Sequence, residues 1–140
     1  GHTFGADIRK LQEFSNVHFL GERPYSELPG YLHDFDVCLI PFKMIPLIEA
    51  THPVKRYEYF AAGKPVVATN MTELYSMADM CYLAKDKEDF LEKLDLAVNE
   101  KNETISNKRI KFASENTWKC RFDTLYDVLK TGSFDIERHS

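Results

Sequence analysis

Two continuous apolar runs constrain this fold more than any other feature of the sequence. They are Val37–Phe42 and Pro65–Thr69. Strands that are apolar on both faces are typical of parallel sheets covered by helices on both sides. Residues 53–62 lie between the runs, with Pro53 suited to a first helical turn and Gly63 to a C-cap. The order strand, helix, strand predicts a right-handed βαβ unit.

Weaker patterns extend this alternation in both directions. Short apolar runs at 17–20 and 80–83 predict two further strands, so we expect about four in total. Asp86 and Asp89 resemble a capping box that opens an amphipathic helix. The other predicted elements are helices at 6–14, 24–32, 108–115 and 118–129, a short helix or turn at 72–78, and a break within the polar stretch 99–107.

The predicted fold is α/β, a Rossmann-like, doubly wound parallel sheet with C-terminal helices. Residues 1–131 are expected to form one domain and residues 132–140 a flexible tail. Because the chain begins on a helix with no strand before it, we expect a segment cut from a larger polypeptide. A complete small α/β protein is the alternative.

Composition excludes several classes of protein. A formal net charge of −4 over 140 residues argues against nucleic-acid binding through bulk positive charge. No apolar run approaches the roughly 20 residues that span a bilayer. The three cysteines, Cys38, Cys81 and Cys120, form no CxxC pair, so we expect reduced, buried thiols in a cytosolic protein. The histidines show no HxH or HExxH spacing, and no metal site is expected.

Ligands of open parallel sheets bind outside the carboxyl ends of the strands. The longest loop at that edge leads into the helix at Pro53. Free backbone N–H groups and the helix dipole attract anions at a helix start, so Thr51 and His52 stand where a phosphate could rest. No GxGxxG, P-loop or GxSxG motif occurs, which disfavours dinucleotide, P-loop and hydrolase sites.

The helix after Pro53 carries a carboxylate in an apolar setting. At about 100° per residue, one face holds Glu58 together with Val54, Tyr57, Ala61 and Ala62. A carboxylate there needs hydrogen-bond partners, and the two hydroxyls of a ribose could supply them. Lys55 could reach a phosphate oxygen from the same region. The alternative, that Glu58 caps a neighbouring loop and Lys55 is solvated, is equally open at this point.

Several segments together resemble a known family. They are Asn16–Gly21, Leu28–Leu32, Phe35–Phe42 and Pro53–Thr69, with Trp118-x-x-x-Arg121 as a looser match. Their order and spacing resemble the C-terminal, donor-binding domain of GT-B glycosyltransferases of family 4, or group 1. The motif Pro-Val-Lys-x-x-Glu-Tyr before Ala-Ala-Gly-Lys-Pro is similar to that of bacterial surface-polysaccharide enzymes of the teichuronic-acid type.

The resemblance implies a set of donor-binding residues. It implies that Glu58 binds the ribose hydroxyls. It also implies that the backbone N–H groups of Thr51 and His52, together with Lys55, bind the diphosphate. The family's second glutamate would stand at position 50, which is Ala50 here, and Glu49 could replace it if the loop shifts. The loop of Gly21, Glu22 and Arg23 matches the family's base-binding loop.

The resemblance also implies an activity and its partners. It implies a retaining transferase that moves a sugar from a nucleotide sugar to a surface polysaccharide or glycolipid, needs no metal or other cofactor, and favours a UDP-sugar over a GDP-sugar. The acceptor site and the catalytic residues would lie on an N-terminal domain of the same polypeptide, so this segment alone should be inactive. The implied location is cytoplasmic, with peripheral association of the full-length enzyme at the inner face of the plasma membrane as an option. The alternative is a non-catalytic nucleotide- or sugar-binding module or a partner-binding domain.

Overall fold

A computed structural model describes residues 7–43 and 52–131 of the chain. The chain divides between Asp34 and Phe35 into two compact units, and each is described by itself. The first unit contains a single helical turn, α1 (Arg9–Gln12), followed by the 3-10 turn η1 (Tyr25–Glu27) and helix α2 (Leu28–Asp34). Of these, η1 and α2 confirm the helix predicted from residue 24, whereas α1 is shorter than the predicted 6–14.

The strand predicted at 17–20 is wrong. The Val17 N–H donates to the Phe14 carbonyl oxygen in a local turn, and no residue from 17 to 20 is assigned to a strand. The side chains of Phe19 and Leu20 are 47% and 45% exposed. A short apolar run indicates a tendency toward burial, but a strand also needs a neighbour to accept its backbone hydrogen bonds.

The second unit contains a parallel sheet of three strands. These are β1 (Cys38–Ile40), β2 (Val66–Thr69) and β3 (Tyr82–Ala84), in the spatial order β1-β2-β3. Cys38 pairs with Val66, and Val67 pairs with Tyr82. Three of the four predicted strands are therefore confirmed. Strands β1 and β2 are shorter than the apolar runs suggested, and β3 begins and ends later than the predicted run at 80–83.

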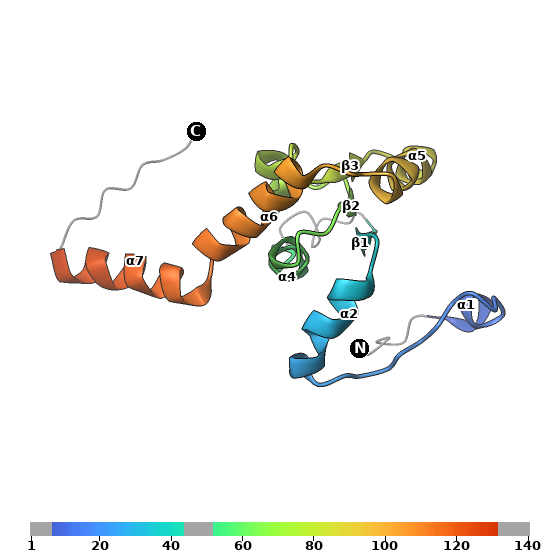
Figure 1. Ribbon diagram of the computed structural model, residues 1–140, viewed down its shortest axis with the longest axis horizontal. Coiled ribbons are helices and arrows are strands. Elements are labelled where there is room, and N and C mark those ends of the chain that lie inside the picture. Colours follow the sequence, from blue (N-terminus) through green and yellow to red (C-terminus); the bar gives the residue numbers. More distant parts are fainter. Residues whose placement is uncertain (1–6, 44–51, 132–140) are drawn as a thin grey trace. The chain divides into compact units, whose positions relative to one another are not determined.

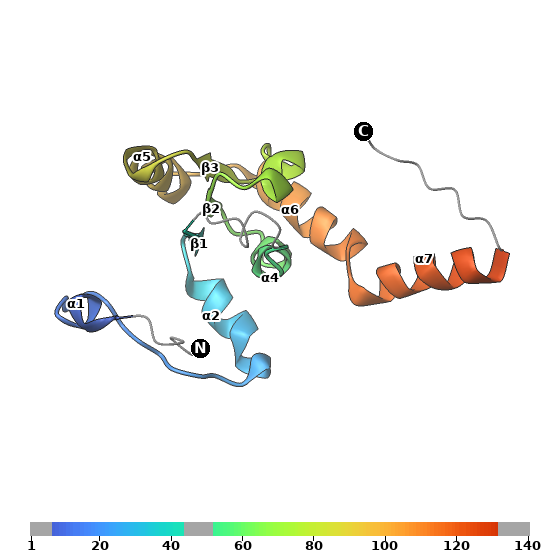
Figure 2. The ribbon, with the colours of Figure 1, turned by 180° about the vertical axis from the view of Figure 1, so that it is seen from behind.

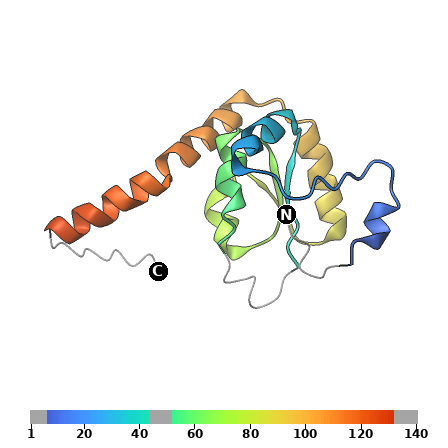
Figure 3. The same cartoon turned by 90° about the horizontal axis from the view of Figure 1, so that it is seen from below.

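Helices cover both faces of this sheet, as the apolar strands require. Helices α4 (Lys55–Ala61) and α5 (Lys87–Val98) lie on opposite sides of it, and both pack against β2 (Figure 3). Helix α6 (Glu103–Glu115) packs against α4, as the front and rear views both show (Figures 1 and 2). The 3-10 segment η2 (Thr72–Met77) connects β2 to β3, and α7 (Trp118–Thr131) follows α6.

The core lies between the sheet and its helices. It consists mainly of Cys38, Ile40, Phe60, Val66, Val67, Ala68, Met71, Leu74, Met77, Met80 and Ala84. Two charged side chains are buried with them, Arg56 on α4 and Arg109 on α6. Of the three cysteines, Cys38 and Cys81 are buried as predicted, whereas Cys120 is only half-buried because α7 buries none of its residues.

Helix ends follow local chemistry that the sequence displays. The Asp86 carboxylate accepts the Asp89 N–H at 2.9 Å, which confirms the predicted cap of α5. Gly63 ends α4 with φ +68°, a conformation that favours glycine. The break predicted within the polar stretch 99–107 is confirmed between α5 and α6. The helix predicted from Lys108 begins earlier, because the Asn102 side chain accepts the Ile105 N–H and starts α6 at Glu103.

No helix in the described part of the chain is long and apolar enough to cross a lipid bilayer.

Candidate functional site

The carboxyl ends of all three strands meet at a hollow of about 290 Å³. Pro41 follows β1, Thr69 and Ala84 end β2 and β3, and the first turn of α5 supplies Lys87 and Phe90. The Thr69 hydroxyl donates to the Phe42 carbonyl oxygen at 2.9 Å and fixes the chain where it leaves β1. A hollow thus occurs at the edge of the sheet where the sequence analysis placed the ligand.

Helix α4 begins at the same edge, because it follows β1 and precedes β2 in a parallel pair. Glu58 lies in its first turn and is half-buried. Within the described residues, the Glu58 carboxylate makes no hydrogen bond or ion pair. The face around it is more open than predicted, since Val54 is 55% exposed and Ala61 is exposed. The described residues therefore leave this carboxylate available to a ligand.

The other predicted residues of this helix start have different surroundings. Lys55 is exposed at the first position of α4. His52 lies just before the helix, and its Nδ1 lies 2.6 Å from the Glu73 carboxylate. Its Nε2 lies 3.1 Å from the Tyr57 hydroxyl, so the imidazole is part of an internal network. A phosphate contact through the His52 backbone stays a prediction.

That network is centred on Arg56, whose side chain is 2% exposed. Its Nη2 donates to Glu73 Oε1 at 3.2 Å and to the Tyr57 hydroxyl at 3.0 Å, and lies 2.8 Å from His52 Nε2. Arg121 of α7 donates to the same Tyr57 hydroxyl at 2.7 Å. Burial opposes ionisation of Glu73, but the hydrogen bonds from Arg56 and His52 outweigh it and hold the pKa of this carboxyl below its ordinary value.

Sequence reasoning missed this network. It links α4 to η2 and α7, from residues up to 64 positions apart in the chain. A helical wheel places Arg56, two positions from Glu58, on a side that looks solvent-exposed. The wheel does not show that another element, η2, packs against that side. The network fixes the first turn of α4, which is the turn that carries Glu58.

The remaining predicted donor-site residues do not belong to α4. Glu49 and Thr51 lie outside the described residues. Gly21, Glu22 and Arg23 belong to the first unit, where Gly21 has φ +69° and the Arg23 guanidinium lies 6.0 Å from the Tyr31 ring centre. The positive φ fits a tight loop at Gly21. Its role in binding a base stays a prediction.

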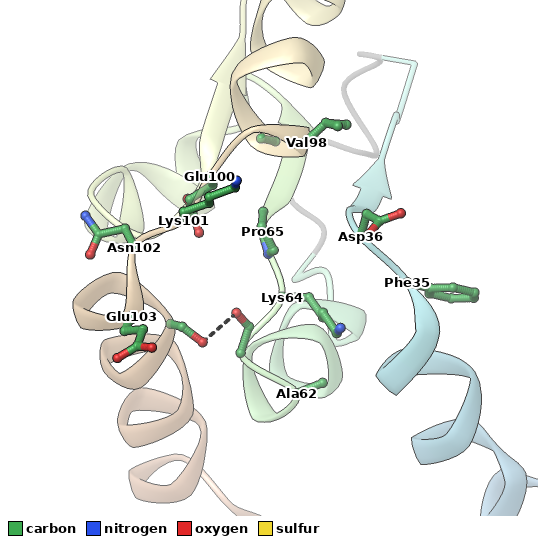
Figure 4. A pocket seen from close by; sticks show the side chains of 13 residues that line it. Phe35, Asp36, Ala62, Lys64, Pro65, Val98, Glu100, Lys101, Asn102 and Glu103 are labelled. Atoms are coloured by element: carbon green, nitrogen blue, oxygen red, sulfur yellow. Dashed lines mark hydrogen bonds between the residues drawn. The ribbon is translucent and has the colours of Figure 1, made fainter.

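A larger hollow, of about 410 Å³, lies at the opposite edge of the sheet (Figure 4). It is bounded by residues that precede strands, Asp36 and Pro65, and by the chain between α5 and α6. The Ser106 hydroxyl donates to the Gly63 carbonyl oxygen at 3.1 Å, which joins α6 to the end of α4. This hollow does not adjoin the carboxyl ends of the strands and is not part of the predicted donor site.

A buried ion pair lies beside this second hollow. The guanidinium of Arg109 donates to both carboxylate oxygens of Glu100, at 2.5 and 2.9 Å, and to the Met80 carbonyl oxygen at 2.7 Å. The Tyr82 hydroxyl adds a fourth bond, to Glu100 at 2.9 Å. Because every nitrogen of this guanidinium is satisfied, the cluster joins α6 to β3 without an unpaired charge.

Comparison with known proteins identifies the family. The sequence profile of the family "Glycosyl transferases group 1" matches residues 2–100, which is more than half of the chain. The chain belongs to this family. It is also 30% identical over 120 residues to TuaH of Bacillus subtilis (strain 168), whose name assigns it to teichuronic acid biosynthesis as a glycosyltransferase. That match covers 82% of this chain but only 30% of TuaH. No solved structure matches the chain significantly.

Family membership confirms the resemblance and the Rossmann-like α/β class inferred from the sequence. The match to the group 1 glycosyl transferases spans every donor-site residue predicted above and ends before α6 begins at Glu103. Among the described residues, no three His, Cys, Asp or Glu side chains gather as metal ligands would. The family match assigns no role to an individual residue, so the role of each site residue is argued from its own chemistry and position.

Proposed function

We propose that this chain is the donor-binding part of a retaining glycosyltransferase that uses a nucleotide sugar. The observation that carries the proposal is the half-buried Glu58 carboxylate, which makes no hydrogen bond or ion pair to another described residue and lies in the first turn of α4. Two sugar hydroxyls can donate to the two oxygens of one carboxylate. Lys55, exposed at the first position of the same helix, supplies a positive charge for the diphosphate.

The proposed reaction is a transfer with retention of configuration at the anomeric carbon. The acceptor hydroxyl attacks that carbon from the side on which the diphosphate leaves. The bond from the carbon to the diphosphate oxygen breaks as the new glycosidic bond forms, and the diphosphate oxygen takes the acceptor proton. Cationic groups and amides at the start of α4 stabilise the negative charge that develops on the diphosphate.

The proposed acceptor, donor and location follow from the similarity to TuaH. We propose a surface polysaccharide or glycolipid as acceptor, held by an N-terminal domain of the same polypeptide, which would also carry the catalytic residues. The proposed donor is a UDP-sugar rather than a GDP-sugar, without a metal. A cytoplasmic location, with peripheral association at the inner face of the plasma membrane, is a further prediction of this assignment.

Ligand-observed NMR tests the proposal on this chain. Saturation transfer is measured to UDP, GDP, a UDP-hexose, a GDP-hexose and the free hexose. We expect transfer to the ribose protons of the uridine ligands and none to the free hexose. Transfer to the free hexose alone would favour a sugar-binding module, and no transfer to any nucleotide would contradict the donor-binding role.

Turnover separates an enzyme from a non-catalytic nucleotide-binding module. The full-length protein is incubated with each nucleotide sugar and membrane extract, and release of the nucleoside diphosphate is measured. Diphosphate release that depends on the extract supports transfer to an acceptor. Nucleotide binding without release under any condition would support the non-catalytic alternative.

A further inference from the structure

Helix α4 is short and begins without a side-chain cap. It has seven residues, and the side chain at its N-cap, Val54, makes no hydrogen bond. The Tyr57 N–H donates to the Val54 carbonyl oxygen at 3.0 Å, which is the tight bond of a 3-10 turn. A helix of this length is not stable in water by itself. The orientation of its first turn, which carries Glu58, therefore depends on contacts from other elements.

One hydroxyl in this turn collects hydrogen bonds from two arginines. The Tyr57 hydroxyl accepts from Arg56 Nη2 at 3.0 Å and from Arg121 Nη2 at 2.7 Å. In the neutral imidazole of His52, Nδ1 carries the proton because it lies 2.6 Å from the Glu73 carboxylate. Its Nε2, 3.1 Å from the Tyr57 hydroxyl, is then free to accept the hydroxyl proton. Two bonds accepted and one donated use the full capacity of this hydroxyl.

The ring of Tyr57 is held separately from its hydroxyl. It stacks on Phe112 of α6, with 6.0 Å between the ring centres and 4° between the ring planes. The guanidinium carbon of Arg121 lies 5.2 Å from the Tyr57 ring centre. Replacing Tyr57 by phenylalanine would therefore keep the stacked ring and remove the oxygen that the arginines share.

Arg121 connects α7 to α4 across 64 positions of the chain. It is exposed, and α7 buries none of its residues, so this contact adds little to the core. Lys119, two positions earlier on α7, instead pairs with Asp123 of the same helix at 2.5 Å. The two cations thus differ in what they hold, because one fixes a side chain of α4 and the other stays within α7.

We propose that Arg121 is a positioning residue of the proposed donor site. By holding the Tyr57 hydroxyl, it keeps the first turn of α4 in one orientation, so that the neighbouring Glu58 carboxylate meets the sugar hydroxyls in the right geometry. Hydrogen bonds weaken steeply when a group is displaced or turned, so the orientation of this turn determines donor affinity. The inference rests on the proposed function. Arg121 acts through Tyr57 and does not itself bind the nucleotide sugar.

Amide hydrogen exchange tests the effect on α4 without any ligand. Exchange of residues 55–58 is measured in the full-length protein. We expect Arg121→Met to make it roughly threefold to tenfold faster, because one hydrogen bond that opposes local opening is lost. Lys119→Met removes a cation from the same helix and should leave exchange unchanged. Arg121→Lys keeps a charged donor and should restore most of the protection. Unchanged exchange in Arg121→Met would overturn the proposal.

Donor binding tests whether this orientation matters to the ligand. Isothermal titration with a UDP-hexose should show a roughly threefold to tenfold lower affinity for Arg121→Met and none of this loss for Lys119→Met. Tyr57→Phe should weaken binding to a similar extent. In the Tyr57→Phe background, Arg121→Met should cause no further loss, because the shared oxygen is already gone. A further loss of the same size would show that Arg121 binds the ligand directly, which would contradict a positioning role.

The two measurements separate failure of this inference from failure of the proposed function. If the native protein and Arg121→Met bind the UDP-hexose equally well, the inference is wrong and the proposed function is unaffected. If the native protein binds no nucleotide sugar, the proposed function is wrong and the inference falls with it, whatever the exchange at α4. Far-UV circular dichroism and urea unfolding check that each variant is folded.

Discussion

Arg56 and Glu58 stand two positions apart on α4 and have opposite surroundings. The Arg56 guanidinium is buried and binds Glu73, whereas the Glu58 carboxylate is half-buried without a hydrogen bond or ion pair to another described residue. One residue therefore fixes the first turn of the helix, and the other is available to a ligand. This separation allows the role of Glu58 to be tested without disturbing the fold.

Glu58→Gln should lower the affinity for a nucleotide sugar and leave the free energy of unfolding nearly unchanged. Two hydrogen bonds from sugar hydroxyls to a charged carboxylate would be weakened, which corresponds to roughly a 10- to 100-fold loss. Isothermal titration with UDP and a UDP-hexose measures the affinity. Glu88→Gln, the same change at an exposed position in the first turn of α5, serves as the control. Equal affinities for all three proteins would remove Glu58 from the donor site.

The elements that could be predicted are those whose signals are local. Val37–Phe42 and Pro65–Thr69 gave two strands because a continuous apolar run is a property of the segment itself. The cap at Asp86 and the stop at Gly63 likewise involve groups within a few residues of one another.

What could not be predicted depends on distant partners. Residues 17–20 are as apolar as a strand, but no sequence signal says whether a neighbouring strand pairs with them. The sequence analysis made no prediction for Arg56 or Arg109, because their burial depends on Glu73 and Glu100, which only the fold brings to them. For the candidate site, the sequence predicted Glu58 and the edge of the sheet, but not the network that holds α4.

The two buried arginines should differ in their effect on stability. Arg109 has a partner for each of its nitrogens, and its loss would leave Glu100, 7% exposed, without a counter-charge. In Arg56, Nε and Nη1 are buried without a hydrogen-bond partner among the described residues, and its acidic neighbour Glu73 is 41% exposed.

Arg109→Met should therefore cost about 3–5 kcal/mol of unfolding free energy. Arg56→Met should cost roughly 1 kcal/mol or less, because the lost hydrogen bonds are offset by the removal of two unpaired buried donors. Urea unfolding followed by far-UV circular dichroism measures both values. A larger loss for Arg56→Met than for Arg109→Met would contradict this ranking.

Glu100 should make stability depend on pH below neutrality. Burial opposes its ionisation, but hydrogen bonds from Arg109 and Tyr82 outweigh burial and hold its pKa below the ordinary value of 4.5. A carboxyl with a lowered pKa in the folded state stabilises the protein above its unfolded pKa, and this contribution is lost as pH falls.

The difference in unfolding free energy between the native protein and Glu100→Gln should therefore be constant near neutral pH and shrink as pH falls below about 4.5. Denaturant titrations at several pH values measure it. Glu88→Gln, at an exposed position in the first turn of α5, serves as the control. A difference that does not change with pH would mean that Glu100 is not ionised in the folded protein.

The three thiols should react at different rates. Burial raises the pKa of Cys38 and of Cys81 to about 11 in each case, so both are protonated at neutral pH and shielded from reagents. Cys120 is half-buried on α7. We expect a disulfide reagent such as DTNB to modify Cys120 first, and the other two only as the protein unfolds. The variant Cys120→Ser should then show no fast phase, and a fast phase that persists would place another thiol at the surface.

Gly63→Ala should destabilise the protein for two separable reasons. Gly63 has φ +68°, where a residue with a Cβ is strained by about 1–2 kcal/mol. The added Cβ would also overlap the Ser106 hydroxyl, which donates to the Gly63 carbonyl oxygen at 3.1 Å. Ser106→Ala removes the obstructing oxygen but not the backbone strain. The cost of Gly63→Ala should therefore be smaller in the Ser106→Ala background than in the native protein, yet not vanish. A double-mutant cycle of thermal unfolding measures this difference, and strictly additive effects would show that α6 does not approach the end of α4 this closely.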